Sequence, residues 1–65
     1  MTVKKYKIDN LIFFRRDIGI LTARLKEIAK INKITYDNKN FCYVIEVDAS
    51  EKFHNELNKL GYTTI

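Results

Sequence analysis

The stretch KITYDNKNFCYVIEVD, residues 33–48, carries the clearest structural signal in this chain. Two segments rich in β-branched and aromatic residues, which are typical of strands, flank a polar Asp-Asn-Lys-Asn at residues 37–40. Asn and Asp tolerate left-handed backbone angles and hydrogen-bond to nearby backbone groups, so they favour a tight turn. The stretch therefore predicts a β-hairpin whose second strand covers residues 41–47.

The orientation of this second strand follows from its one acidic residue, Glu46. Side chains alternate between the two faces of a strand, and a buried carboxylate without a partner is costly. We therefore expect Glu46 to face water and the alternate apolar residues to face the helices, namely Phe41, Tyr43, Ile45 and Val47.

The segment DASEKFHNELNKLGYTTI, residues 48–65, predicts a helix followed by a short last strand. Asp48 and Glu51 have the spacing of a capping box at a helix start. Gly61 suits a left-handed cap at the helix end. The inward stripe consists of Phe53, Leu57 and Leu60.

Towards the N-terminus, residues 3–15 alternate loosely and predict the first strand. The hydrophobic period then changes within RRDIGIL, residues 15–21, which predicts a strand-to-helix turn. Asp17 suits the N-cap, because its carboxylate can accept a free backbone N–H and oppose the helix dipole. The apolar face of this helix would consist of Ile18, Leu21, Leu25, Ile28 and Ala29.

The order strand–helix–strand–strand–helix–strand predicts a ferredoxin-like α+β fold, with two helices on one face of a four-stranded antiparallel sheet. Residues 1–65 would form this single domain. We expect a core of Leu21, Leu25, Ile28, Phe53, Leu57 and Leu60 packed onto Ile12, Phe14, Tyr43 and Ile45.

Composition argues against several classes of protein. No apolar run is long enough to span a bilayer, and no apolar stretch follows the N-terminal charges as in a signal peptide. A single cysteine fits a reducing compartment, so we expect a cytoplasmic protein. The net charge is +4, with most basic residues in the first 39 positions, which would suit an anionic partner or a second copy of the chain.

Catalytic chemistry is not expected from this chain. Nucleophilic and metal sites need His or Cys beside other ligands, and the chain has one of each, His54 and Cys42. A mid-strand cysteine is usually a small buried hydrophobe, and we expect a solvated or half-buried His54. We predict a protein that is not an enzyme and that uses no cofactor or metal.

Gly19 has two interpretations. A glycine in the first turn of a helix costs up to about 1 kcal/mol in helix propensity, so a reason for it is expected. One interpretation is close packing of the helix against the sheet. The other is that a ligand or a second subunit approaches backbone N–H groups at the helix N-terminus.

A resemblance to ACT domains bears on this second interpretation. RRDIGILTARLKEIAKIN, residues 15–32, resembles the first strand–helix unit of that family, and YVIEVDASEKFHNELNKLGYTTI, residues 43–65, resembles its closing part. ACT domains are regulatory modules that bind amino acids or other small molecules at dimer interfaces. The resemblance implies a ligand site at Asp17, Ile18, Gly19 and Leu21, and a role in sensing a small metabolite or binding a protein partner.

A weaker resemblance points to a different class of function. KNFCYVIEV, residues 39–47, is similar to the third-strand motif of RNA-recognition domains, in which aromatic rings stack on unpaired bases. The residues that would bind a single-stranded nucleic acid are Arg15, Arg16, Lys39, Phe41 and Tyr43. A third class, a protein-interaction effector or inhibitor that acts through a sheet edge, also fits a chain of this size.

A homodimer is expected in either of two ways. With both helices on one face of the sheet, the other face would carry an apolar patch that a small monomer rarely leaves exposed. That predicted interface consists of Leu11, Phe13, Cys42 and Val44. Pairing through an edge strand is the other route, because an edge presents free N–H and C=O groups.

Overall fold

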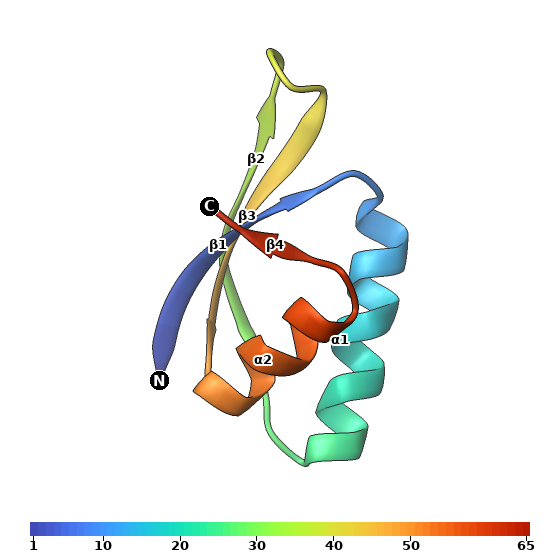
Figure 1. The fold of residues 1–65 in the computed structure, drawn as a ribbon, viewed down its shortest axis with the longest axis vertical. Coiled ribbons are helices and arrows are strands. Elements are labelled where there is room, and N and C mark those ends of the chain that lie inside the picture. Colours follow the sequence, from blue (N-terminus) through green and yellow to red (C-terminus); the bar gives the residue numbers. More distant parts are fainter.

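The computed structural model describes residues 1–65 and contains six elements (Figure 1). They are β1 (Thr2–Ile8), α1 (Leu11–Leu25), β2 (Lys30–Asp37), β3 (Cys42–Ala49), α2 (Glu51–Lys59) and β4 (Thr63–Thr64). The sheet is antiparallel, with strand order β2-β3-β1-β4. This βαββαβ arrangement confirms the predicted ferredoxin-like α+β fold.

The two central strands, β1 and β3, pair along their full length, from Thr2 opposite Ala49 to Ile8 opposite Tyr43. Residues directly opposite each other in an antiparallel pair face the same side of the sheet. The helix-facing side therefore carries Tyr6 and Ile8 together with alternate residues of β3. Ile45, Val47 and Ala49 are fully buried there, which confirms the predicted orientation of this strand from Tyr43 onward.

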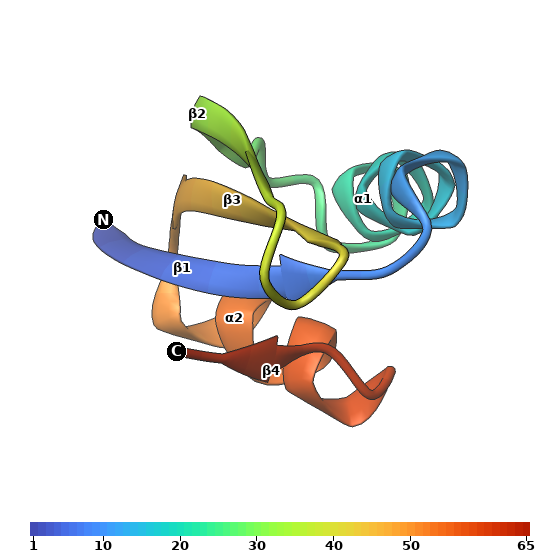
Figure 2. The ribbon, with the colours of Figure 1, turned by 90° about the horizontal axis from the view of Figure 1, so that it is seen from above.

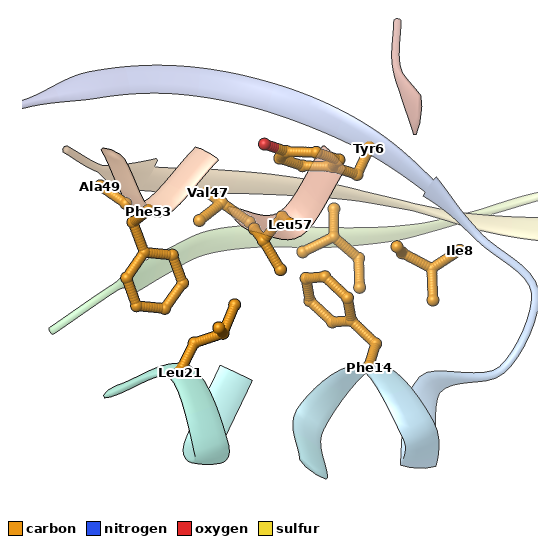
Figure 3. Close-up of a cluster of buried hydrophobic side chains, with 9 residues drawn as sticks. Tyr6, Ile8, Phe14, Leu21, Val47, Ala49, Phe53 and Leu57 are labelled. Atoms are coloured by element: carbon orange, nitrogen blue, oxygen red, sulfur yellow. The ribbon is translucent and has the colours of Figure 1, made fainter. Parts of the chain in front are cut away.

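Both helices contribute side chains to the core. Figure 3 shows Phe14 and Leu21 of α1 pointing at the residues of β1 and β3, with Phe53 and Leu57 of α2 beside them. Leu25 and Tyr43 are half-buried and pack against this cluster. The buried core consists of Tyr6, Ile8, Phe14, Leu21, Ile45, Val47, Ala49, Phe53 and Leu57.

The predicted boundary between the first strand and the first helix is wrong. β1 ends at Ile8, and α1 begins at Leu11, where the sequence pattern predicted a strand. The helix starts there because the side chain of Asn10 accepts a hydrogen bond from the Phe13 N–H at 3.1 Å. Asp17 consequently lies inside α1 rather than at its N-cap. Loose alternation in residues 3–15 concealed a helical spacing that already includes Leu11, Phe14 and Ile18.

Three predicted core residues are exposed instead. Ile12 and Ile28 are each 77% exposed and Leu60 is 53% exposed. Ile12 lies on the outer side of α1, which the shifted helix boundary explains. Ile28 follows the end of α1, where Lys26 takes a left-handed conformation (φ 55°) and stops the helix. Leu60 is the C-cap of α2, beyond its inward stripe.

The second helix starts two residues later than predicted. Ser50, and not Asp48, is the N-cap: its Oγ accepts from the Phe53 N–H at 3.2 Å and donates to Glu27 at 2.6 Å. At the other end the prediction for Gly61 is confirmed, since its φ is +101°. The Gly61 N–H donates to the Asn58 carbonyl, and the next N–H donates to the Leu57 carbonyl, which together form a Schellman motif.

The predicted hairpin turn lies between β2 and β3 and projects beyond both helices (Figure 1). The Asp37 carboxylate closes it by accepting from the Lys39 N–H at 2.9 Å and from the Asn40 amide at 2.8 Å. These hydrogen bonds hold the pKa of Asp37 below its usual range. Phe41 is part of the turn, with φ 53° and 78% exposure, so the expectation that it faces the helices is wrong.

Gly19 lies in the middle of α1, and a Cβ built on it would meet nothing within 4 Å. The interpretation that Gly19 permits close packing of helix and sheet is therefore wrong. The structure contains no tight contact or positive φ at this position that would require a glycine.

Replacing this glycine should stabilise the fold. We expect Gly19→Ala to raise the free energy of unfolding by about 1 kcal/mol, because alanine is the better helix former and its methyl group enters open space. Gly61→Ala is the matched control and should lower it by about 1 kcal/mol, because an L residue is strained at φ +101°. Urea titrations of the three proteins measure both changes. A Gly19→Ala variant less stable than the unmodified chain would contradict this assignment.

Candidate functional site

The residues implied by the ACT resemblance do not form a cavity. Leu21 is buried in the core, and Ile18 is half-buried against it. Asp17 accepts a hydrogen bond from the Tyr62 hydroxyl at 2.5 Å and one from Arg16 at 3.3 Å. Because Gly19 is in the helix interior, its neighbouring N–H groups belong to the helix ladder rather than to a free N-terminus. This part of α1 therefore offers no ligand site of the predicted kind.

The residues assigned to the nucleic-acid alternative lie in three separate places. Arg15 and Arg16 are exposed on α1, whereas Lys39 and Phe41 are at the hairpin turn. Tyr43 is on the helix-facing side of the sheet, where its ring packs edge-on against Tyr36 with centroids 5.1 Å apart. Consequently, the open face of the sheet lacks the aromatic pair on which bases would stack.

The predicted apolar interface is likewise divided. Leu11 and Phe13 belong to α1, not to the sheet, and Cys42 is buried. By the register, Val44 and the buried Cys42 lie on the open face of the sheet, where Val44 is half-buried among charged neighbours. The side chains that the register places on this face are mostly charged: Lys5, Lys7, Lys30, Lys33, Asp37, Glu46 and Asp48.

A shallow hollow lies on this open face. Glu46 is at its centre, because the register places it opposite Lys5 on one side and Lys33 on the other. Val44 is its one apolar residue, and Thr35 completes the lining. With one carboxylate between two ammonium groups, the lining of the hollow has a net charge of +1 and little apolar surface.

A larger groove, open to solvent, lies at the N-terminal end of α1. Three segments that are distant in the sequence build it: the end of β1, the first turn of α1, and the loop between α2 and β4. Its lining consists of Lys7, Asp9, Asn10, Phe13, Leu60, Gly61 and Tyr62.

The apolar side of the groove is held by specific contacts. The Tyr62 ring meets Phe14 edge-on with centroids 5.2 Å apart, and its hydroxyl donates to Asp17. Burial, with the bond to Asp17, raises the pKa of Tyr62 to about 12, so this hydroxyl stays protonated at neutral pH. The guanidinium of Arg16, also on α1, lies over the Phe13 ring at 4.9 Å from its centroid.

The polar side carries opposite charges. Lys7 and Asp9 are both exposed at the end of β1, and no ion pair within the chain uses either of them. The groove thus combines a free ammonium, a free carboxylate and three apolar side chains. The sequence patterns did not predict this groove. Two signals of chain reversal were present, the helix cap at Gly61 and the polar pair Asp9-Asn10, and both residues of that pair and Gly61 line the groove.

Of the polar groups that line this groove, the Asn10 side chain caps α1 and the Tyr62 hydroxyl is bonded to Asp17, which leaves Lys7 and Asp9 as its charged groups. The structure contains no group of three His, Cys, Asp or Glu side chains that could hold a metal ion. No helix is long and apolar enough to cross a membrane. Comparison of the chain with protein-family models, curated proteins and solved structures gives no match.

A second polar cluster, around His54, is fully buried, which differs from the expected solvated or half-buried imidazole. Its Nε2 lies 2.7 Å from the Thr2 carbonyl oxygen and its Nδ1 lies 2.6 Å from the Tyr6 hydroxyl. A carbonyl only accepts, so Nε2 carries the proton and donates it, and Nδ1 accepts from Tyr6. Both ring nitrogens are therefore used to attach α2 to β1.

This buried pair predicts how stability depends on alkaline pH. Burial, with a contribution from the Glu51 charge, raises the pKa of Tyr6 from 10.0 to about 12. The pKa of Tyr6 is higher in the folded state than in the unfolded state. The contribution of the protonated Tyr6 hydroxyl to folding stability is therefore complete below pH 10 and is lost as the pH rises through 12. Tyr6→Phe should remove the loss of folding stability at alkaline pH that is due to Tyr6. At neutral pH it should lower the free energy of unfolding by about 1–3 kcal/mol, because Nδ1 of His54 is left without a donor.

Urea titrations between neutral pH and the alkaline limit would measure both effects. A smaller decline should persist in the Tyr6→Phe variant, because the pKa of Tyr62 is also raised to about 12. An unchanged pH dependence in the variant would contradict the role given to Tyr6.

Proposed function

We propose that this protein is a non-enzymatic binding module that holds a small zwitterionic metabolite, such as an amino acid with an apolar side chain, in the groove at the N-terminal end of α1. The observation that carries the proposal is the placement of Lys7 and Asp9 beside an apolar surface formed by Phe13, Leu60 and Tyr62. An ammonium and a carboxylate that make no ion pair within the chain complement the two charges of a zwitterion.

The chemistry of such a complex follows from these groups. The Lys7 ammonium would pair with the ligand carboxylate and Asp9 with its amino group, while the apolar side chain displaces water from the rings of Phe13 and Tyr62. The role agrees in kind with the one implied by the ACT resemblance, but the residues are different. A single chain supplies the whole groove, so binding does not depend on dimerisation.

Isothermal titration calorimetry against a panel of amino acids tests the proposal. We expect saturable binding of apolar amino acids at one site, with little dependence on salt. Lys7→Gln and Asp9→Asn should each weaken binding about tenfold or more, because each removes one charge-assisted contact. Lys5→Gln is the matched control: it removes a lysine from the same strand and face but from outside this groove, and should bind as the unmodified protein does.

Single-stranded RNA serves as the competing ligand class. RNA bound through lysine and arginine would lose affinity steeply with salt through counterion release. Salt-sensitive RNA binding without any saturable amino-acid binding would replace the proposed function with the nucleic-acid alternative.

A further inference from the structure

The outer edge of β2 is unoccupied. β2 pairs with β3 alone, and Figure 2 shows it as the last strand on its side of the sheet. The opposite edge is β4, which is only two residues long. β2 is eight residues long, so it presents the longer row of unpaired N–H and C=O groups.

The part of β2 that is regular enough to accept another strand is Lys33–Asp37. A register shift lies between Ile31 and Lys33, and from Lys33 onward each residue pairs in turn with β3. In this segment Ile34 and Tyr36 are on the helix-facing side, opposite Ile45 and Tyr43. The remaining residues, Lys33, Thr35 and Asp37, are on the open side.

The sequence of this segment, KITYD, complements itself when it is paired antiparallel about its central threonine. Lys33 would then lie opposite Asp37 of the second copy, Ile34 opposite Tyr36, and Thr35 opposite its own equivalent on the two-fold axis. Each of these pairs lies on one face of the sheet. Opposite charges, an aliphatic–aromatic contact and a Thr–Thr pair are all favourable cross-strand neighbours.

We propose that the partner of this edge is a second copy of the chain, bound through Lys33–Asp37 in the register centred on Thr35, which joins two four-stranded sheets into one. Such an interface is isologous, because each residue meets its complement on the other copy.

The exposure of these side chains supports the pairing. Ile34 is 39% exposed and Tyr36 is 47% exposed, although both are on the helix-facing side. They lie on the edge strand of the sheet, which no further strand of the chain covers (Figure 2). The Tyr36 ring is already held against Tyr43 in an edge-on contact, so little of its rotamer freedom remains to be lost.

Neighbouring registers lack these matches. Pairing centred on Ile34 places Lys33 opposite Thr35, and pairing centred on Tyr36 places Asp37 opposite Thr35. In both cases the charges lose their partners. Lysines and bulges commonly protect an edge strand from unspecific pairing. In β2 the bulge before Lys33 and the charge of Lys33 leave the register centred on Thr35 as the favourable one. Five paired residues form a small interface, so we expect a weak, concentration-dependent dimer.

Disulfide cross-linking tests the register. Thr35→Cys would bring two thiols together on the two-fold axis, whereas Lys33→Cys would hold them too far apart for a disulfide. The first variant should form a covalent dimer at least about tenfold faster than the second under mild oxidation. Cys42 is buried, so the unmodified chain is the blank. Equal rates for the two variants, or no cross-link with Thr35→Cys, would overturn the proposal.

Sedimentation equilibrium of charge variants tests the pairing without an introduced cysteine. Lys33→Glu places two acidic residues together at each end of the interface and should weaken the dimer by roughly tenfold or more. Lys30→Glu is the matched control, because Lys30 is exposed on the same strand and also lies opposite an acidic residue of β3, outside Lys33–Asp37. Circular dichroism confirms that both variants fold. An unmodified chain that stays monomeric, or two variants that associate equally, would contradict the inference.

Discussion

The full-length register between β1 and β3 is the constraint on which the rest of the structure depends. Side chains alternate with a period of two, so a slip of one residue would turn Tyr6 and Ile8 to solvent and bring lysines to the core. The same register determines where His54 finds its partners, since both the Tyr6 hydroxyl and the Thr2 carbonyl belong to β1. Through that imidazole, the sheet fixes the position of α2.

The two faces and two edges of the sheet consequently have different properties. The helix-facing side is mostly apolar and covered, except on the edge strand β2, where Ile34 and Tyr36 are exposed. The open side carries alternating charges, which disfavours a large apolar interface there. The loop that precedes the short β4 lines the groove at the N-terminal end of α1, while the long β2 forms a free edge of the sheet. The proposed binding groove and the proposed self-pairing edge therefore use separate parts of the sheet.

The candidate groove could not be predicted from the sequence. Lys7, Phe13 and Tyr62 have no common spacing and no shared motif, and they meet only because β1, α1 and the α2–β4 loop converge. The ligand site predicted from the ACT resemblance is wrong because the start of α1 was placed too late in the sequence. Once the capping role of Asn10 is recognised, Asp17 and Gly19 belong to a helix interior, and the anion-binding geometry assigned to them disappears.

By itself, the sequence determined the element order, the hairpin turn, the cap at Gly61 and most of the core. These depend on local chemistry: turn residues with left-handed tolerance, helical spacing of apolar residues, and alternation in β3. Only the tertiary structure decided where α1 begins, that His54 is buried, and which polar groups face the groove. Those features depend on contacts between segments far apart in the chain, such as Thr2 with His54 and Asp17 with Tyr62, which no local pattern encodes.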